Sequence, residues 1–99
     1  MNEGIKHDQD KPNWSLLPLS TVEEVVKVLD HGAKKYAPYN WQRMEDRSRF
    51  LSAALRHLSA YQDDEVLDPE SDLHHLAHAT CNLIFLLWHE QNQPHSTSS

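Results

Sequence analysis

Histidine is the residue type that stands out in this chain: it occurs eight times, against two glycines and one cysteine. His75 and His78 are spaced so that, on a helix, they are neighbours and can present ring nitrogens to one metal ion. Asn82 follows on the same helical stripe. Imidazole nitrogen binds zinc, manganese, iron or nickel, and nearby carboxylates complete a site for a divalent cation. The pattern predicts a metal site with His75 and His78 as ligands.

The carboxylates that could complete this site lie just upstream, where the chain turns into the same helix. Asp68 and Glu70 are the candidate metal ligands, while Glu65 and Glu70 are candidates for activating water. Helix capping and compensation of the helix dipole are the alternative roles for these acids. For Asp68 the capping role is as well supported as ligation, and the two roles can coexist.

Residues earlier in the chain supply further candidates. His57 is a candidate catalytic residue, although a histidine at the edge of an apolar face is more often structural. Its neighbour Arg56 shares a helix face with Arg49 one heptad earlier. Two arginines so placed can clamp a phosphate or carboxylate through paired hydrogen bonds, or can simply solvate the surface. Lys35, Asn40 and Trp41 form a second group, able to hold phosphate, read a base edge and stack on a base. The alternative for this group is an ordinary loop with a packed tryptophan.

The histidine stripe of the predicted third helix is expected to face a pocket or a partner subunit. A solvated face is the alternative, but the stripe continues as Phe85 and Leu86, which should not face water. The segment 81–88 is also apolar nearly all round, as in a central or interface helix. The opposite face is predicted to form the main core, through Leu73, Leu76, Ala77, Leu83, Ile84 and Leu87.

Helix signals divide the chain into elements that position these residues. Ser20 begins a predicted capping box, Asp46 is the predicted N-cap of a second helix, and Asp68 followed by Pro69 is predicted to begin a third. No strand-like alternation is long enough to build a sheet. The sequence therefore predicts an all-α fold: a compact bundle of three main helices at about 20–37, 47–63 and 69–91, with a short element at 14–17.

We expect a single helical domain over 14–91, a polar arm over 1–13 and a disordered tail over 92–99. A chain of 99 residues has a small core, so a homo-oligomer is expected.

The composition excludes several classes of partner and site. A formal net charge of −6 argues against a nucleic-acid backbone as partner. With so few glycines, phosphates would be held by side chains and a metal rather than by a Gly-rich loop. The single Cys81 excludes an internal disulfide framework and lies in an apolar run. The polar N-terminus has no apolar signal segment, and the longest apolar run is too short to span a membrane. We therefore expect cytoplasmic residence and neither nucleic-acid nor membrane partners.

Several motifs in order resemble a family of small phage and bacterial proteins, the dATP/dGTP diphosphohydrolases or their N-terminal domain. The family in turn resembles the MazG-like all-α nucleotide pyrophosphohydrolases. The matching segments are Asp10-Lys11-Pro12, Leu16-Leu17-Pro18, Gly32-Ala33-Lys34-Lys35-Tyr36, Asn40-Trp41, Ala54-Leu55-Arg56-His57-Leu58, Asp68-Pro69-Glu70-Ser71, and His75-Leu76-Ala77-His78-Ala79 with Asn82.

The resemblance implies an oligomeric, metal-dependent enzyme that hydrolyses a purine deoxynucleoside triphosphate to monophosphate and pyrophosphate, in the host cytoplasm if phage-encoded. Metal chemistry suits this reaction because cations neutralise phosphate oxygens and activate water. The MazG pattern uses ExxE and ExxD carboxylates, whereas this chain has His57 and His75-x-x-His78 in the corresponding regions. A mixed site fits these residues better, with Mn²⁺, Mg²⁺ or another transition ion as cofactor. Asp72 lies where this family is expected to have glycine; it would add a ligand or have no effect.

Three functional hypotheses follow. In the first, a pyrophosphohydrolase, the histidine and carboxylate set holds metal or activates water, and Lys35, Asn40, Trp41, Arg56 and Asn82 hold the nucleotide. In the second, the same pocket at a subunit interface binds a nucleotide without hydrolysing it, as a phage sponge that sequesters a nucleotide signal would. In the third, the chain is a helical assembly module and its histidines carry no ligand.

Overall fold

Three α-helices and two short 3-10 turns make up the computed structural model, which describes residues 10–92. The helices are α1 (Leu19–Lys35), α2 (Arg47–Gln62) and α3 (His75–Asn92), and the turns are η2 (Trp14–Leu16) and η3 (Asn40–Arg43). Within the described part there is no strand, and none of its helices is long and apolar enough to cross a membrane. The predicted all-α bundle of three main helices is confirmed. Residues 1–9 of the predicted arm and 93–99 of the predicted tail lie outside the described residues.

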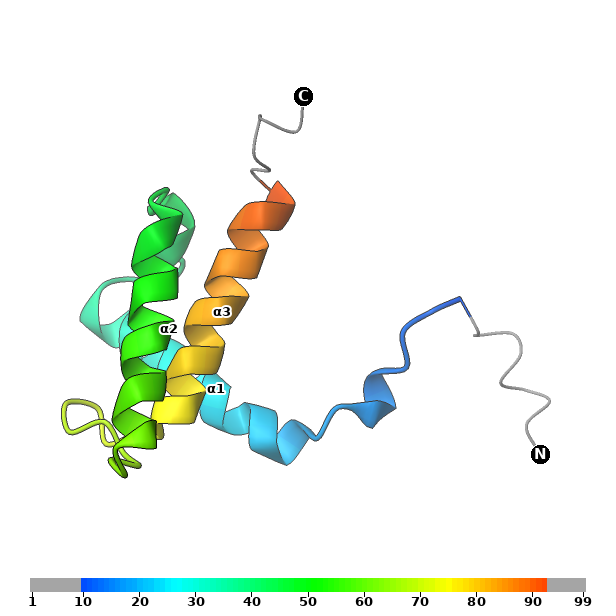
Figure 1. Ribbon diagram of the computed structural model, residues 1–99. Coiled ribbons are helices and arrows are strands. Elements are labelled where there is room, and N and C mark those ends of the chain that lie inside the picture. The colour runs from blue at the N-terminus through cyan, green and yellow to red at the C-terminus, as the bar shows by residue number, and fades with distance from the viewer. Residues whose placement is uncertain (1–9, 93–99) are drawn as a thin grey trace.

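Helices α2 and α3 run antiparallel side by side, and α1 crosses them (Figure 1). The first half of α1 and η2 project away from the helix pair, so the described chain has the outline of an L (Figure 1). Gly32 is tolerated inside α1, and the helix ends before Pro38, as the restriction on residues preceding proline requires.

The predicted starts of the first two helices had different outcomes. Asp46 is the N-cap of α2, because its carboxylate accepts a hydrogen bond from the Ser48 N–H at 3.1 Å. The predicted capping box at Ser20 is wrong, because α1 begins at Leu19 and its N-cap, Pro18, makes no side-chain hydrogen bond. The Pro18 carbonyl accepts hydrogen bonds from the backbone N–H groups three and four residues on, so the helix begins one residue earlier than predicted.

The third helix begins later than predicted, and Asp68 is not its N-cap. The Asp68 carboxylate instead accepts a hydrogen bond from the N–H of Ser71 at 3.0 Å, and its carbonyl accepts one from Asp72 at 2.7 Å. Asp72 has a φ of 63°, which no helix can continue through. Just before α3, the ring Nδ1 of His74 accepts a hydrogen bond from the N–H of Leu76 at 3.0 Å. A histidine therefore takes the capping role that the sequence assigned to an aspartate.

The buried face of α3 is the reverse of the predicted one. The predicted core residues Leu76, Leu83, Ile84 and Leu87 are 36–58% exposed, although Ala77 is buried and Leu73 packs against the core. The histidine stripe faces inward, as expected, and His75 is 4% exposed. Small residues let the helices approach closely, and the core is correspondingly small. Its buried apolar members are Val25, Val28, Phe50, Ala54, Ala77, Ala79 and Cys81.

Candidate functional site

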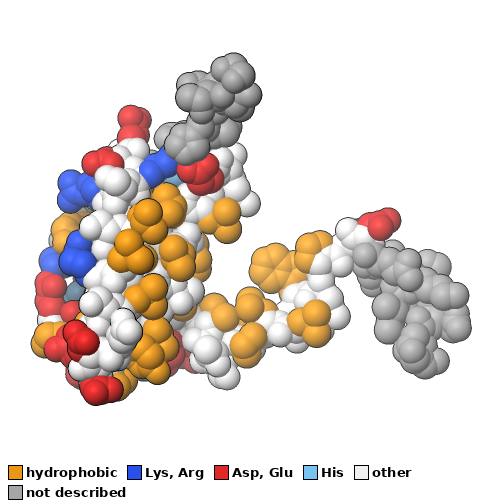
Figure 2. Space-filling view, viewed as in Figure 1, with side chains coloured by type: hydrophobic (Ala, Val, Ile, Leu, Met, Phe, Trp, Pro, Cys, Tyr) orange, Lys and Arg blue, Asp and Glu red, His pale blue; other side chains and the backbone are white. Residues whose placement is uncertain are grey.

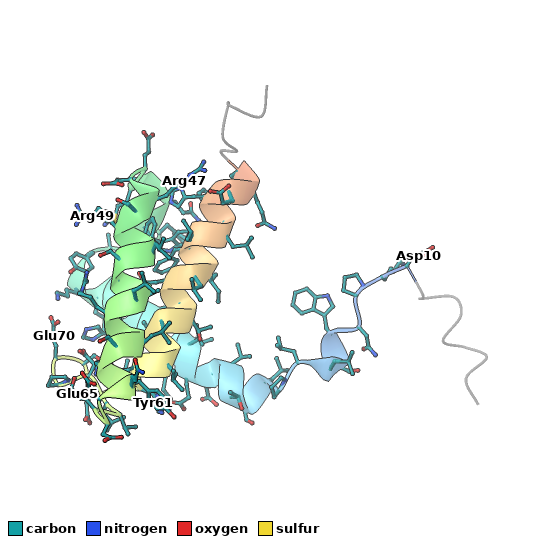
Figure 3. All side chains as sticks on the ribbon, viewed as in Figure 1. Asp10, Arg47, Arg49, Tyr61, Glu65 and Glu70 are labelled. Atoms are coloured by element: carbon teal, nitrogen blue, oxygen red, sulfur yellow. The ribbon has the colours of Figure 1, made fainter. Side chains whose placement is uncertain are left out.

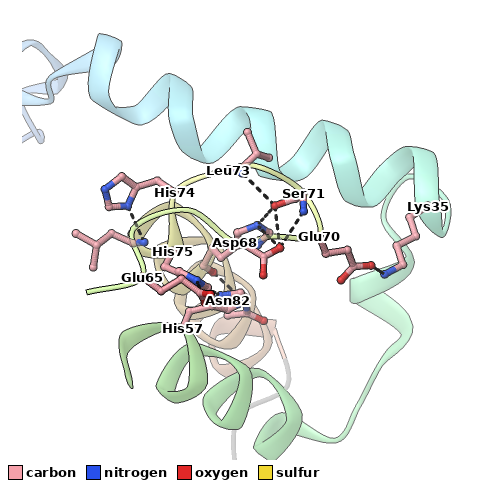
Figure 4. Close-up of polar contacts among 12 residues, drawn as sticks. Lys35, His57, Glu65, Asp68, Glu70, Ser71, Leu73, His74, His75 and Asn82 are labelled. Atoms are coloured by element: carbon pink, nitrogen blue, oxygen red, sulfur yellow. Dashed lines mark hydrogen bonds and ion pairs between the residues drawn. The ribbon is translucent and has the colours of Figure 1, made fainter. Parts of the chain in front are cut away.

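Three potential metal ligands from separate segments meet where α2 ends and α3 begins. His57 comes from α2, His75 is the first residue of α3, and Asp68 comes from the loop between them. Each offers one ligand atom, and these atoms lie within 4.8 Å of one another. The two Nδ1 atoms of the histidines are 2.8 Å apart (Figure 4). At this separation either one nitrogen donates its proton to the other, or both lone pairs face a shared cation.

Glu65 fixes the orientation of the buried histidine in this cluster. The Nε2 of His75 lies 2.8 Å from the Glu65 carboxylate (Figure 4). An ionised carboxylate can only accept, so Nε2 carries the proton and the Nδ1 of the neutral ring presents a lone pair toward His57. Carboxylate–histidine pairs of this kind orient metal ligands in proteins. Glu65 therefore lies behind the ligand set, holding His75, rather than among the ligands.

A serine connects Asp68 to the second histidine of the stripe. The Ser71 hydroxyl is 3.0 Å from the Asp68 carboxylate and 2.7 Å from the Nε2 of His78. The ionised Asp68 must accept the hydroxyl proton, so the Nε2 of His78 donates to Ser71. The ring of His78 also stacks on that of His57 at 4.5 Å and 9°. His78 is thus held beside the cluster, and its assignment as a metal ligand remains a prediction.

The protonation tendencies of this region suit cation binding. Burial, and then the neighbouring histidines, lower the pKa of His57. Burial likewise lowers the pKa of His78, although Asp68 opposes this. For Asp68, burial would raise the pKa, but the hydrogen bonds from the Ser71 N–H and hydroxyl lower it. Near neutral pH the two rings are therefore uncharged and the carboxyl is charged, which are the forms that bind metals.

A cavity of about 1090 Å³ opens beside the cluster. It lies between the second half of α1, the segment that joins α1 to α2, one side of α2 and the middle of α3. Its size is at the upper end of ordinary small-molecule sites. His57 and Asp68 of the cluster line it together with His78, whereas the buried third ligand, His75, does not. All five predicted nucleotide-binding residues also line it: Lys35, Asn40, Trp41, Arg56 and Asn82.

Three cations border the cavity. The ammonium of Lys35 forms an ion pair with Glu70, which lowers the pKa of Glu70 (Figure 4). Arg56 and Arg49 line the cavity from α2, and both are exposed. Arg49 and Glu70 project on the side of α2 away from the projecting N-terminal half of α1 (Figure 3). Because Lys35 already neutralises Glu70, this acid faces a cation rather than the three-ligand cluster.

The remaining predicted nucleotide-binding residues already make contacts within the chain. The ring of Trp41 stacks on Phe85 at 4.4 Å and 16°, which is the packed role given as its alternative. The side-chain amide of Asn82 donates to the carbonyl of His78 at 2.9 Å, leaving its oxygen available. Asn40 makes only a long contact of 3.8 Å to the sulfur of Met44. Of the three, Asn40 is the least constrained.

Sequence reasoning missed two residues of this region, Ser71 and His31. Ser71, which links Asp68 to His78, belongs to one of the matching family segments but was assigned no role. His31 lines the cavity from α1. Its spacing of i, i+4 from Lys35 places both on one face of α1, a signal that was available.

Asp72 takes the backbone conformation of a glycine. Its φ of 63° lies in the left-handed region that glycine adopts freely and that aspartate tolerates. Asp72 is not part of the ligand cluster, so the conformation explains the expected glycine without a metal role.

Comparison with known proteins identifies a family that matches this chain. A family model described as "dATP/dGTP diphosphohydrolase, N-terminal" matches residues 1–99. A Salmonella phage PMBT28 protein named dATP/dGTP diphosphohydrolase is 41% identical over 93 residues, which cover 94% of this chain and 32% of the relative. The chain thus spans about a third of the length of this relative. No solved structure gives a significant match.

Proposed function

Because the chain belongs to the dATP/dGTP diphosphohydrolase N-terminal family, we propose that it binds a purine deoxynucleoside triphosphate with a divalent cation and hydrolyses it. In this reaction water adds to the α-phosphorus while the bond to the α–β bridging oxygen breaks, and the products are the monophosphate, pyrophosphate and a proton. The observation that carries the proposal is the His57, Asp68 and His75 cluster, of which His57 and Asp68 line a cavity bordered by cations.

The cation is assigned to this cluster on the chemistry of its donors. Two imidazole nitrogens with one carboxylate suit manganese or a related transition ion better than magnesium, which prefers oxygen ligands. A divalent ion supplies charge neutralisation at phosphate oxygens and a more acidic bound water. His57, His75 and Asp68 would hold it, with Glu65 as the positioning residue for His75.

The remaining residues of the cavity would bind the nucleotide. Arg49 and Arg56 lie one heptad apart on α2, so both guanidinium groups can reach a phosphate chain in the cavity. Asn40 offers an amide that can read a base edge. The ammonium of Lys35 would pass from Glu70 to a phosphate, which would release the Glu70 carboxylate beside the cavity to orient water.

A second function, nucleotide binding without hydrolysis, is favoured by two observations. Both candidate water-activating acids are engaged, since Glu65 bonds to His75 and Glu70 to Lys35. The relative that carries the diphosphohydrolase name is also about three times as long as the matched segment, so that name describes more than the part matched here. On this view the same cavity and cation hold the ligand.

Pyrophosphate release separates the two functions. The purified chain is incubated with each dNTP and Mn²⁺ or Mg²⁺, and thermal shifts are recorded in parallel. Hydrolysis of dATP or dGTP that His57→Gln abolishes would support the enzyme. A thermal shift with nucleotide but no pyrophosphate release would support the binding function.

The nucleotide assignment has its own control. Arg56→Gln should weaken nucleotide binding several-fold, whereas Arg43→Gln, which removes an exposed arginine outside the cavity, should not. Equal effects of the two substitutions would show only a loss of overall positive charge.

A further inference from the structure

The two ends of the cavity are lined by different chemistry. His78, beside the ligand cluster of His57, Asp68 and His75, lies at the start of α3, whereas Phe85 lies further along this helix. With a rise of about 1.5 Å per residue, His78 and Phe85 are about 10 Å apart along α3. This separation is comparable to the distance between the phosphates and the base of a nucleotide. A nucleotide bound through its phosphates at the ligand cluster would therefore place its base at the Phe85 end.

The Phe85 end of the cavity is formed by the segment 36–41, which leads from α1 into η3. Trp41 fixes this segment to α3, because its ring stacks on Phe85 at 4.4 Å and makes an edge contact with Trp88 at 5.1 Å. The Nε2 of the fully buried His89 donates a hydrogen bond to the Trp41 carbonyl at 2.8 Å. Trp41 therefore anchors η3 through contacts inside the chain.

Tyr39, by contrast, has an exposed ring at the wall of the cavity. The residue is 68% exposed and lines the cavity. Within residues 10–92 its ring makes no hydrogen bond, ion pair or ring contact. The nearby Tyr36 is also exposed, but the Lys35 ammonium lies 5.2 Å from the centre of its ring. Tyr39 therefore carries the aromatic ring of this segment that no contact in the described chain occupies.

The backbone of Tyr39 supports a role in binding. Its φ of 63° and ψ of 13° lie in the left-handed region, which a residue with a bulky side chain seldom adopts. Such conformations cost free energy and cluster at functional sites. Glycine or asparagine would suit this turn better, and the tyrosine ring adds no packing within the chain. This combination indicates that the ring contacts something outside the chain.

We propose that the base of the bound nucleotide stacks on Tyr39, while its phosphates lie toward His57 and Asp68. The inference rests on the proposed function, because it assigns the two ends of that ligand to the two ends of one cavity. Arg56 lies beside His57 at the phosphate end, and Asn40 lies beside Tyr39 at the base end. Stacking on an aromatic side chain grows with the area of the base, so a purine gains more from Tyr39 than a pyrimidine does.

Dissociation constants of uncleavable ligands test the stacking. The ligands are the α,β-methylene analogues of dATP and dGTP, with inorganic tripolyphosphate as the ligand that has no base, each titrated calorimetrically in the presence of Mn²⁺. Tyr39→Ala should raise the dissociation constants of both nucleotide analogues by about fivefold or more, and should leave that of tripolyphosphate unchanged. Tyr39→Phe keeps the ring and should bind every ligand as the wild type does.

Two further variants interpret the result. Trp14→Ala removes a 76% exposed ring of η2, outside the cavity, and should bind every ligand as the wild type does. Figure 2 shows this part of the chain standing clear of the helix pair. Tyr39→Gly should bind the nucleotide analogues as weakly as Tyr39→Ala does. It should also unfold at a higher denaturant concentration, because glycine adopts a φ of 63° freely.

Each alternative outcome has a distinct meaning. Unchanged nucleotide affinity in Tyr39→Ala would overturn the stacking and leave the proposed function intact. Equal losses for the nucleotides and tripolyphosphate would overturn it, because the ring would then not contact the base. Lower stability of both Tyr39→Ala and Tyr39→Gly would overturn it by giving the ring a structural role. A wild type that binds neither nucleotide analogue would overturn the proposed function as well.

Discussion

Glu65 gives the most discriminating single substitution in the proposed metal site. Its carboxylate accepts a hydrogen bond from the Nε2 of His75 at 2.8 Å and so turns the other ring nitrogen toward His57. Removing such a supporting carboxylate typically weakens metal binding 10- to 100-fold. Because the Glu65 side chain is 51% exposed, we expect the lower end, about tenfold or about 1.4 kcal/mol. The predicted change for Glu65→Ala is therefore a tenfold rise in the Mn²⁺ dissociation constant.

Isothermal titration with Mn²⁺ measures this change, and two further variants interpret it. Glu65→Gln keeps an oxygen that can accept the hydrogen bond and should lose less affinity than Glu65→Ala. Asp63→Ala removes an exposed carboxylate nearby that has no contact with His75, and should bind Mn²⁺ as the wild type does. If Asp63→Ala and Glu65→Ala weaken Mn²⁺ binding equally, the loss comes from the change in net charge, and the reasoning about His75 is refuted. Unchanged affinity in Glu65→Ala would refute it as well.

Three further predictions concern the fold. Burial raises the pKa of the Cys81 thiol to about 12, so the folded state favours the neutral thiol. Its contribution to stability is therefore intact below pH 9 and is lost as pH rises, by about 1.4 kcal/mol at pH 10. Denaturant unfolding against pH should show this loss in the wild type but not in Cys81→Ala. Asp72→Gly should stabilise the chain against denaturant by up to about 1 kcal/mol, because φ is 63° there. The control Asp63→Gly, at a φ of −90°, should destabilise it. A loss of stability in Asp72→Gly would contradict the conformational argument. Ala54→Leu should cost about 1–3 kcal/mol in chemical denaturation, because Ala54 is 1% exposed within the small core; an unchanged midpoint would mean that the core has spare volume.

The helix pattern was readable because local signals fix it. Asp46 before a polar first turn gave the start of α2, and the spacing of histidines and apolar residues identified α3. The start of α3 was not readable. Asp68 followed by Pro69 is an ordinary N-cap signal. Here the Asp68 carboxylate accepts its hydrogen bond from Ser71 within a loop, and the positive φ of Asp72 prevents a helix from continuing through that residue. Whether Asp68 caps a helix or a loop is decided by tertiary contacts, which a short stretch of sequence does not reveal.

The sequence predicted which residues form the candidate site but not which of them contact one another. The spacing of His75 and His78 predicted a shared metal, yet the structure groups His75 with His57 and Asp68 and ties His78 to Ser71. That grouping depends on how α2 and α3 pack, which helical periodicity cannot give. The prediction of which face of α3 is buried was wrong for a related reason. Periodicity finds two sides of a helix, and where both are apolar it cannot say which one faces the rest of its own chain.

Anomalous diffraction from crystals soaked with Mn²⁺ tests the central claim most directly, because it locates the ion without relying on activity. The account predicts a manganese peak within bonding distance of His57, Asp68 and His75, with Glu65 still bonded to His75. A peak at Glu70 instead, or no peak although titration shows binding, would contradict the assignment of the metal to these three residues.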